Sequence, residues 1–594
     1  MNASTSSSAQ PPNPTSLGQR ARRNSWREPV FGLLLVLPPM AVLVLLVIYP
    51  AFEAVKFSLG LIPEDNPAYA SGMDLVRSST PTFLAFTKLF ASQFFTDNFA
   101  LTLRVSLVSV ILLVLVSYPL ALFSRFGRGK PAEVIRVLSL LPMFVPVIIA
   151  TYALITFFGD NGWAEAILMR FGIPYNSIIR QESGIVLGQI WVGIPFAVLM
   201  LSSGLDSISN ESLEAARDQG ASAWTLFSRI VLPLNLVPLL IVLTFSFIGV
   251  FGSYTVPYML GPTAPQMLGV SMSLNFGAFR QPQTAVAMAV VSFAACALAG
   301  AAYVWAITRQ RRTTGDGRLM RYLWFLEHPA MRRAFTLSVV IVLAAFLILP
   351  LLTLLLWAFS ERWFYPALVP QQFGLKWWSW ILENTDISKA AFWSFTIAPT
   401  VTVLAAVICL PAAYAFARFE FPFKRVFYVA LLASNAFPKL GLYIAIATVF
   451  FQLRLVGTFW GVVFVHLINT LVTMTWIPAA GFASVPRELE EAARDLGASP
   501  LRVFFTITLP IALPSVIVAG ILTFLSSLDE AQATLIIGAP NVLTMPVQMY
   551  TLVGNYPEPV GAIFSLLLGA PSVILLLLAR RFLMSGYIAA GFKG

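Results

Sequence analysis

Charged side chains are scarce in this chain. Only 11% of its 594 residues are Asp, Glu, Lys or Arg, whereas 58% are hydrophobic. Soluble domains carry about 25% charged residues, so the composition excludes an ordinary soluble enzyme or binding module. We expect an all-α polytopic membrane protein, because a helix satisfies every backbone polar group within one segment when no water is available.

Cysteine and histidine are also scarce, with two of each. Cys296 and Cys409 lie within apolar segments, which argues against a structural disulfide and leaves no metal-ligand spacing. His328 and His466 stand apart from any nucleophile or carboxylate pattern, so we expect structural roles for both. The sequence has no phosphate-binding loop of the form Gly-x-x-x-x-Gly-Lys-Ser/Thr, and Gly127–Pro131 is only a basic loop. The chain is therefore expected to be no enzyme and to bind no metal or cofactor itself.

Long apolar runs are what the sequence has in abundance. Segments of about 20 mostly apolar residues, long enough to span a bilayer as helices, recur about twelve times, six in each half of the chain. They lie near residues 30–57, 99–123, 134–158, 183–204, 229–251, 284–308, 334–359, 391–417, 425–451, 457–479, 508–528 and 560–582. The expected organisation is a disordered cytoplasmic tail over 1–28, a first half over 29–310, a cytoplasmic linker over 311–333 and a second half over 334–594.

Lys and Arg indicate the orientation of these segments, because positively charged loops tend to stay in the cytoplasm. They gather before the first span and after the second, sixth, eighth and twelfth, as at Arg27, Arg125, Arg312, Lys424 and Arg581. This pattern predicts a multi-pass protein of the inner (plasma) membrane with both termini in the cytoplasm. The net charge of +11 is therefore explained by topology and gives no support to nucleic-acid binding.

One polar segment occurs twice between the apolar runs. Residues 214–222 read Glu-Ala-Ala-Arg-Asp-Gln-Gly-Ala-Ser, and residues 491–499 read Glu-Ala-Ala-Arg-Asp-Leu-Gly-Ala-Ser, 277 positions later. Each copy precedes a Leu-Pro step at the same distance. The repeat indicates two homologous halves joined end to end, with a polar helical finger projecting from each on the cytoplasmic side.

The composition of each finger predicts a helix, a glycine stop and a second helix returning to the membrane. In the second copy, Ser484 and Pro486 suit a helix start, and Gly497 suits a left-handed stop. Ser499 then suits a fresh cap. The paired alanines leave the helix slim enough to enter a groove on another protein, with polar contacts at its edge. The contact residues predicted on this basis are Ala215, Ala216, Arg217, Asp218, Ala492, Ala493, Arg494 and Asp495.

The repeated segment resembles the EAA motif of bacterial ABC importer permeases, Glu-Ala-Ala followed by Gly and then Leu-Pro. The resemblance covers the chain from about residue 30, once in each half. It implies the fold of a type I ABC importer, in which each finger is a coupling helix that docks into a separate ATPase. The coupling positions that the resemblance implies are Glu214, Ala215, Ala216, Gly220, Glu491, Ala492, Ala493 and Gly497. The implied partners are two copies of that ATPase, which would bind ATP and Mg, an extracytoplasmic solute-binding protein and the lipid bilayer. The fused form departs from the commoner arrangement of two separate permeases.

Charged residues inside spans are costly and are candidates for a solute pathway. Asp529 and Glu530 end the eleventh span, where the first half has Gly252 and Ser253, and Lys439 falls near the middle of the ninth. The alternative for the two carboxylates is a solvated helix end, and for Lys439 it is an internal salt bridge to one of them. Ser253 and Tyr254 complete the pathway candidates.

The identity of the cargo stays open at the level of sequence. Residues 251–261 and 527–530 resemble spermidine/putrescine-type permeases, which implies an amine or another small polar solute. Lys439 would repel a polycation, so a zwitterion or an aminophosphonate-like solute fits both charges better. Related fused permeases carry ferric iron, and residues 585–594 resemble the ends of carbohydrate permeases.

Two further alternatives concern the outer face and the class of protein. Trp363, Phe364, Tyr365, Trp377, Trp378 and Trp380 form either a contact for the binding protein or an interfacial aromatic belt. An ion-coupled secondary transporter is the rival function, in which Asp529, Glu530 and Lys439 would act as a relay. A receptor or scaffold is disfavoured, because the sequence contains no soluble sensory domain.

Overall fold

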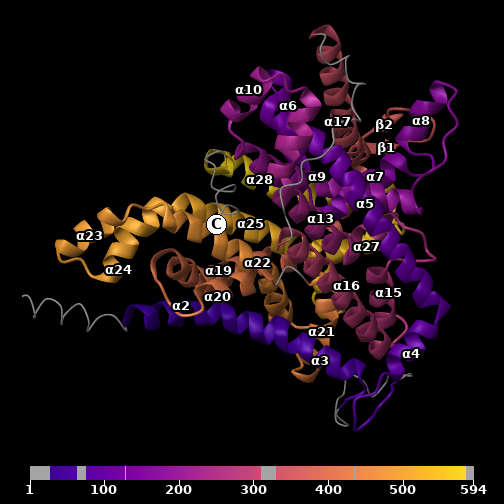
Figure 1. The fold of residues 1–594 in the computed structure, drawn as a ribbon. Helices are drawn as coiled ribbons and strands as arrows, with labels where there is room; N and C mark the ends of the chain where they lie inside the picture. The colour runs from indigo at the N-terminus through magenta and orange to yellow at the C-terminus, as the bar shows by residue number, and fades with distance from the viewer. Residues whose placement is uncertain (1–26, 63–74, 128, 309–328, 434–436, 584–594) are drawn as a thin grey trace, which may run out of the picture.

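The computed structural model describes residues 27–62, 75–127, 129–308, 329–433 and 437–583 (Figure 1). The expected tail over 1–28 and linker over 311–333 fall almost entirely outside these residues. The first half contains α2 (Arg27–Leu43), η1 (Val44–Ile48), α3 (Tyr49–Ser58), α4 (Leu84–Ala91), α5 (Gln93–Phe126), α6 (Lys130–Leu140), η3 (Leu141–Phe144), α7 (Val147–Phe158), α8 (Trp163–Arg170), α9 (Glu182–Asp206), α10 (Asn210–Asp218), α11 (Ala223–Leu226), η4 (Phe227–Val231), α12 (Leu232–Leu234), α13 (Leu236–Phe251), α14 (Thr255–Leu260), α15 (Leu268–Gly277) and α16 (Pro282–Thr308).

The second half follows a similar order with an added hairpin of two strands. Its elements are α17 (Pro329–Ala358), β1 (Ser360–Arg362), β2 (Gln372–Phe373), α18 (Lys376–Glu383), α19 (Thr385–Arg418), α20 (Lys424–Ala433), α21 (Lys439–Gln452), α22 (Phe459–Ala483), α23 (Arg487–Asp495), α24 (Pro500–Val503), η7 (Phe504–Thr508), α25 (Leu509–Leu528), α26 (Gln532–Ile537), α27 (Met545–Leu552) and α28 (Glu558–Leu583). The antiparallel strands β1 and β2 pair Ser360 with Phe373. The expected all-helical fold is confirmed.

Some of the predicted spans are broken helices. Within the described residues, nine helices are long and apolar enough to cross a membrane, or up to eleven if two bent pairs are each one span. The range 134–158 bends by 107° between η3 and α7, and 229–251 bends by 65° at Asn235. Pro146 explains the first break, because a proline disfavours the helical conformation of the residue before it, and Val145 is extended.

The expected span over 425–451 is also divided. It is split into α20 and the short apolar helix α21, with residues 434–436 between them outside the described part of the chain. The expectation that one continuous helix covers this range was wrong, and Pro438 at the start of α21 accounts for the division. If the two bent pairs and the pair of α20 and α21 are each counted as one span, the described residues contain about twelve spans, as expected.

The two halves are intertwined through their first helices. The first-half helix α2 packs along α19 of the second half, and the second-half helix α17 packs against α6 and α7 of the first. In the same way, α16 packs on α21 and α28 packs on α7. Both hydrophobic cores therefore contain residues from both halves.

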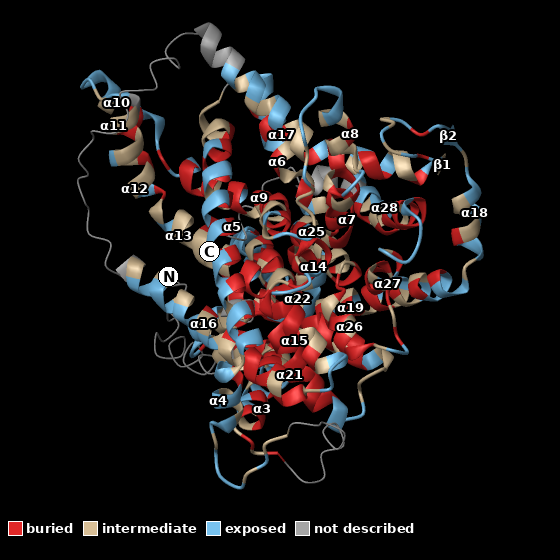
Figure 2. Ribbon diagram, turned by 90° about the vertical axis from the view of Figure 1, so that its right-hand side faces the viewer, coloured by how far each residue is buried: buried red, intermediate tan, exposed pale blue. Residues whose placement is uncertain are grey.

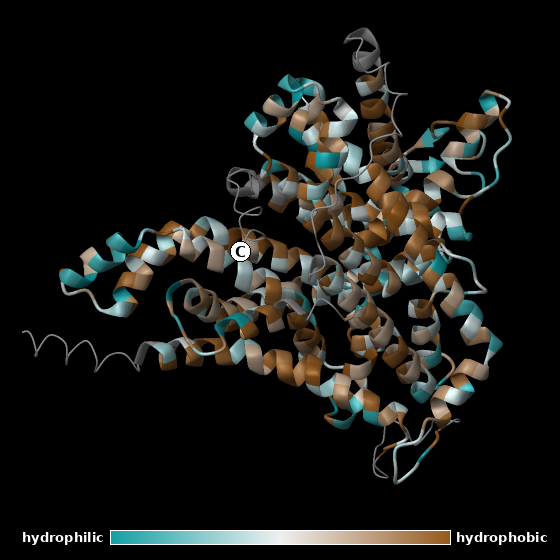
Figure 3. Ribbon diagram, viewed as in Figure 1, coloured by the Kyte–Doolittle hydropathy of each residue, from teal (hydrophilic) through white to brown (hydrophobic). Residues whose placement is uncertain are grey.

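The most buried of the long helices packs between two other helices of the second half, α19 and α25. Within the apolar stretch of 18 residues in α22, 83% of the residues are buried, compared with 28% in α17 and in the span that contains α25. Figure 2 shows this concentration of buried residues around α21, α22 and α15, while α5 and α17 present exposed faces. Those exposed faces are apolar, as expected for surfaces in contact with lipid (Figure 3).

Small residues allow close helix packing at equivalent positions of the two halves. Gly204 on α9 faces Asn235 and Pro238, and Gly481 on α22 faces Ser515 of α25. A Cβ atom at either glycine would overlap these neighbours. The match between Gly204 and Gly481, 277 residues apart, shows that the repeat extends from the fingers into the helix contacts that support them.

Candidate functional site

The first finger is the helix α10 with its return through α11. Ser209 caps α10 by accepting a hydrogen bond from the Ser212 N–H, and Gly220 ends the finger at φ +83°. The predicted residues Glu214, Ala215, Arg217 and Asp218 are exposed, and Ala216 is half-buried. The helix is amphipathic, because Leu213 is buried on its inner side. An exposed, glycine-terminated helix of this kind is suited to contact with another protein.

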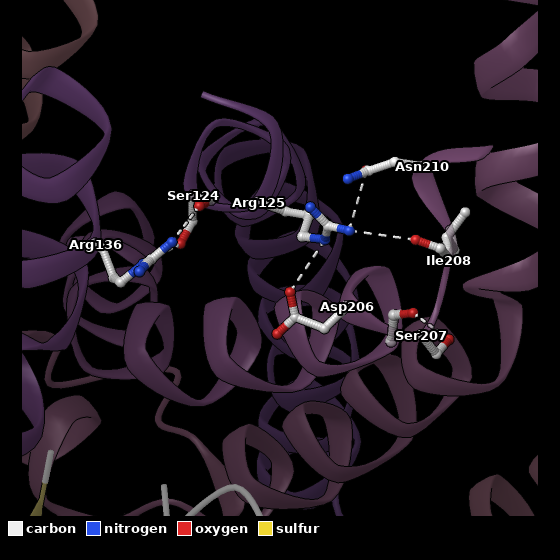
Figure 4. A network of polar contacts seen from close by, with 8 residues as sticks. Ser124, Arg125, Arg136, Asp206, Ser207, Ile208 and Asn210 are labelled. Carbon is white, nitrogen blue, oxygen red and sulfur yellow. Dashed lines mark hydrogen bonds and ion pairs between the residues drawn. The ribbon is translucent and has the colours of Figure 1, made fainter. Parts of the chain in front are cut away.

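The base of the first finger is held by an arginine at the end of α5. The Arg125 guanidinium lies 3.2 Å from the Asp206 carboxylate and donates to the Ile208 carbonyl and the Asn210 side chain, each at 3.3 Å. Figure 4 shows Arg125 between α9 and the start of α10. Arg136 of α6 donates to the Ser124 carbonyl at 2.6 Å and thereby fixes the end of α5. The contacts of Arg125 connect α10 to a membrane helix.

The second finger is α23 with its return through α24. Gly497 adopts φ +84°, and Ser499 caps α24 by accepting from the Arg502 N–H, as expected. The expectation for Ser484 was wrong: Ser484 closes α22 by donating to the Gly481 carbonyl, and Pro486 alone precedes α23. The predicted residues Glu491, Ala492, Arg494 and Asp495 are exposed, and Ala493 is half-buried.

A buried ion pair anchors the second finger and was not found from the sequence. The Glu490 carboxylate lies 2.9 Å from the Arg418 guanidinium and accepts from the Thr508 hydroxyl at 2.7 Å. Arg418 also donates to the Val485 carbonyl at 2.8 Å. The signal was available, because Glu490 aligns with the buried Leu213 and so falls on the inner face of the helix.

The loop between α19 and α20 lies beside this second finger. Lys424 forms a hydrogen bond of 2.8 Å with Glu420 and lowers the pKa of that carboxyl, and Arg487 at the start of α23 acts in the same direction. Glu420 is therefore ionised at neutral pH. The base of the second finger thus carries paired charges, in contrast to the apolar helices around it.

The pathway candidates meet where broken helices from the two halves cross. The Val147 N–H, at the start of α7, donates to the Asp529 carboxylate, at the end of α25, at 3.4 Å. At the equivalent crossing, an added Cβ at Gly252 would lie 2.8 Å from the Cβ of Pro438. Lys439 follows Pro438 as the first residue of α21, so it lies at the break of this divided span, and it is exposed. Among the described residues, Lys439 forms no salt bridge within 4 Å.

Glu530 belongs to a hydrogen-bonded network inside the second half. Its carboxylate accepts from the Tyr443 hydroxyl at 3.0 Å, the Asn469 amide at 2.6 Å and the Ala533 N–H at 2.9 Å. The residue is 8% exposed, so a solvated helix end is excluded for it. His466 lies in the same region and has both ring nitrogens within 2.9 Å of hydroxyls, of Ser527 and Thr534.

Ser253 and Tyr254 lie at the corresponding place in the first half. The Ser253 hydroxyl accepts from the Gln189 amide at 2.7 Å. Tyr254 is buried and packs edge-on against Tyr550 of the second half, with ring centroids 5.7 Å apart. The Tyr550 hydroxyl lies 2.7 Å from that of Thr255, so this tyrosine joins the halves beside the crossing helices.

A cavity of about 570 Å³ lies between the halves on the side that carries the β1–β2 hairpin. Trp163 of the first half and Trp357, Trp363 and Trp377 of the second line it, together with Asp160, Glu361 and Glu558. Other predicted aromatic residues are fixed by packing: the Trp378 indole donates to the Ala358 carbonyl at 2.8 Å, and Trp380 packs on Tyr556. Phe364 is 68% exposed beside the cavity.

The fingers and the hairpin lie on opposite sides of the molecule. In Figure 1, α23 is at the far left and α10 is at the top near the middle, whereas α8, β1, β2 and α4 are on the right. Polar residues gather at both ends and apolar residues lie between them (Figure 3). Within the described residues, no group of three His, Cys, Asp or Glu side chains is placed to hold a metal ion. The arrangement is suited to transmitting movement from one side of a membrane to a pathway between the halves.

Known proteins resemble this chain half by half. Residues 113–312 and 406–586 each match the family described as "binding-protein-dependent transport system inner membrane component". The trehalose transport system permease protein SugB of Mycobacterium tuberculosis is 29% identical over 36% of this chain and 80% of its own length. The putrescine transport system permease protein PotI of Escherichia coli is 27% identical over 41% of this chain and 90% of its own length. The maltose/maltodextrin permease protein MalG of Vibrio vulnificus is 30% identical over 42% and 91%.

The family profile covers well over half of the chain, once in each half, and the relatives are transport subunits and not enzymes. The predicted resemblance to ABC importer permeases is therefore confirmed. This chain belongs to the family of inner membrane components of binding-protein-dependent transport systems, and it carries two copies of the family's domain in one polypeptide.

Proposed function

We propose that this chain forms the whole transmembrane pathway of an ATP-driven importer, with one half on each side of the pathway. Two copies of a separate ATPase, which bind ATP and Mg, dock on α10 and α23, and an extracytoplasmic binding protein delivers the solute to the opposite face. Both termini and both fingers lie in the cytoplasm. The observation that carries this proposal is the pair of exposed, glycine-terminated helices on one side of the molecule, each tied to a membrane helix by an arginine.

The mechanism follows from how each finger is attached. When the ATPases close on ATP, α10 and α23 move toward each other. Arg125 passes this movement from α10 to α5 and α9, and Arg418 passes it from α23 to α19. Because α19 packs on α2 and α22, a displacement there moves elements of both halves. The pathway between the halves then changes from inward-facing to outward-facing.

Co-purification tests this proposal. The tagged chain is isolated from its native host in mild detergent, and accompanying proteins are identified by mass spectrometry. We expect an ATPase at about two copies per permease, and its loss when Glu214 and Glu491 are both changed to Ala. The matched control is Glu383→Ala, an exposed carboxylate on α18 at the opposite face. A clean chain that moves solute on an ion gradient would favour the secondary transporter instead.

The cargo is proposed to be a small polar solute with a cationic group, such as an amine, a polyamine or an aminophosphonate-like zwitterion. Support comes from the carboxylate of Asp529 between the halves and from the putrescine permease among the relatives. Relatives named for trehalose and maltose make a carbohydrate the second candidate, and ferric iron is a third. Uptake assays in cells with and without the chain, using putrescine, 2-aminoethylphosphonate, ferric citrate and trehalose, discriminate among them.

A further inference from the structure

The repeat produces two crossings between the halves, and their chemistry differs. At one crossing, Val147 at the start of α7 meets Asp529 at the end of α25; at the other, Pro438, just before α21, meets Gly252 at the end of α13. In a perfectly symmetric molecule the two contacts would be alike. Instead, Asp529 stands at one crossing where Gly252 stands at the other. Because of this asymmetry, only one of the two crossings has a carboxylate at the contact between the halves, which is Asp529.

The carboxylate of Asp529 is incompletely bonded. One oxygen accepts the Val147 N–H at 3.4 Å, which is a long bond, and the other oxygen is buried with no hydrogen-bond partner among the described residues. The neighbouring Glu530 differs, because three donors satisfy it within its own half. Buried polar groups are normally paired, so an open acceptor position on a carboxylate within a membrane indicates a ligand or a functional role.

The surroundings of Asp529 are closed in this conformation. Tyr550 bonds to Thr255 across the halves, and its ring contacts Tyr254 and Tyr258. Gly252 leaves no space beside Pro438. A backbone N–H at a helix N-terminus carries partial positive charge, so Val147 supplies the kind of donor that a carboxylate accepts in place of a cation.

We propose that Asp529 is a specificity-determining residue of the pathway, which accepts the Val147 N–H while the halves are closed and an ammonium-type donor of the solute when they part. Separation of α7 from α25 removes the Val147 N–H and leaves the carboxylate without a partner. A positively charged group on the solute then replaces that donor, while a neutral or anionic solute does not. Lys439, exposed at the start of α21 beside the other crossing, carries a positive charge that acts on Asp529 and sets a second requirement, which a zwitterion meets. The proposal rests on the proposed function only for the statement that a solute passes here.

A cysteine reporter tests this without knowledge of the cargo. Cys296 and Cys409 are first replaced by Ala, and Val147→Cys then places a thiol beside Asp529 while keeping the backbone N–H. The purified full chain is treated with two methanethiosulfonate reagents of similar size, one with a trimethylammonium group and one with a sulfonate. Asn555→Cys, in the exposed turn between α27 and α28, gives the reference ratio of the two rates.

Three variants at the carboxylates separate the two parts of the proposal, which are the attraction of a cationic group by Asp529 and the closure of the halves through its bond to Val147. With Asp529 present, we expect the cationic reagent to be favoured at position 147 by about tenfold over the reference ratio. Asp529→Asn keeps an acceptor oxygen and removes the charge, so the preference should fall to the reference value with little change in mean rate. Asp529→Ala also removes the acceptor, and both rates should rise about tenfold. Glu530→Gln removes the adjacent carboxylate and should leave the ratio unchanged.

Each result bears on one statement. A ratio that Asp529→Asn does not alter would show that the carboxylate does not face the opening, and a ratio that Glu530→Gln alters equally would assign the charge to the wrong residue. Unchanged rates in Asp529→Ala would overturn the role in closure. Size-exclusion profiles identify any variant that fails to fold, and Asp529→Asn, which is nearly isosteric, keeps the test decisive in that case. None of these outcomes depends on an ATPase, so they are distinct from failure of the co-purification experiment.

Discussion

The guanidinium of Arg418 lies 2.9 Å from the carboxylate of Glu490, and the two side chains are only 7% and 5% exposed. This pair joins the second finger to α19, and Thr508 extends the contact to η7. The first finger has Leu213 at the position of Glu490 and depends on the more exposed contact between Arg125 and Asp206. The two fingers of one chain are therefore anchored by different chemistry.

Removing one partner of this ion pair should destabilise the protein more than replacing both partners by apolar residues. Arg418→Met leaves the buried Glu490 with only the long contact to Arg494, at 3.9 Å, as a counter-charge, and losing the close partner of a buried pair typically costs about 3–5 kcal/mol. Arg418→Met combined with Glu490→Leu reproduces the apolar situation around Leu213 and should recover most of that loss. Thermal unfolding of the detergent-solubilised chain measures both variants. A double variant no more stable than Arg418→Met alone would show that the pair stabilises the finger through Val485 and Thr508 instead.

A bulky residue at Gly497 should disturb the second finger. Gly497 adopts φ +84°, and a β-branched side chain there is strained by about 1–2 kcal/mol or more, although nothing lies within 4 Å of an added Cβ. We expect Gly497→Val to leave the protein inserted in the membrane but to uncouple ATP hydrolysis from uptake. Gly497→Asn is the matched control, because Asn tolerates this conformation. Normal uptake by the Val variant would count against the coupling role of α23.

Close packing of α22 on α25 should depend on Gly481. An added Cβ would overlap the Ser515 side chain, and overpacking of this kind costs about 1–3 kcal/mol. Gly481→Ala should therefore lower the unfolding temperature and the yield of monodisperse protein, as should Gly204→Ala in the first half. Gly520→Ala lies on α25 with nothing within 4 Å and should behave like the parent chain. Equal stability of all three variants would contradict the packing found here.

The hydroxyl of Tyr550 should contribute to the contact between the halves. Tyr550→Phe removes the 2.7 Å bond to Thr255 but keeps the ring against Tyr254, so we expect a loss of about 1 kcal/mol from the closed arrangement. Thr255→Val should have a similar effect, and the double variant should be little worse than either. The reaction rate of a cysteine at position 147 reports the change. Fully additive effects would indicate that the two hydroxyls do not act on each other.

Much of the fold could be predicted from the sequence because membrane helices are defined by length and apolarity. Ranges such as 183–204 and 457–479 correspond to α9 and α22, and the repeat located both fingers and their glycine stops. The breaks at Val145 and before Pro438 were missed, since hydropathy does not register a local change of backbone direction. Prolines inside α5 and α19 leave those helices continuous, so proline alone does not identify a break.

The candidate site was predictable only where it is local in sequence. Asp529 and Glu530 are adjacent, yet one reaches across to Val147 and the other turns into its own half. Their different roles depend on which helices approach them, and these come from positions hundreds of residues away. The buried position of Glu490 was the exception, because comparison with Leu213 in the repeat contained that information.

The exchange of first helices between the halves has a consequence for how the protein is made. During synthesis, α2 enters the membrane long before its packing partner α19 exists, whereas α17 emerges when α6 and α7 are already in place. The α2 part of the first helix therefore lacks this partner until the second half arrives, although its continuation α3 packs on α16 of the first half. Two separate polypeptides would have to find each other to complete the same contact, and would have to be produced in equal amounts. In a single chain, the α19 that packs on each α2 is synthesised later in the same polypeptide. A first half without its second half therefore arises only when translation stops early.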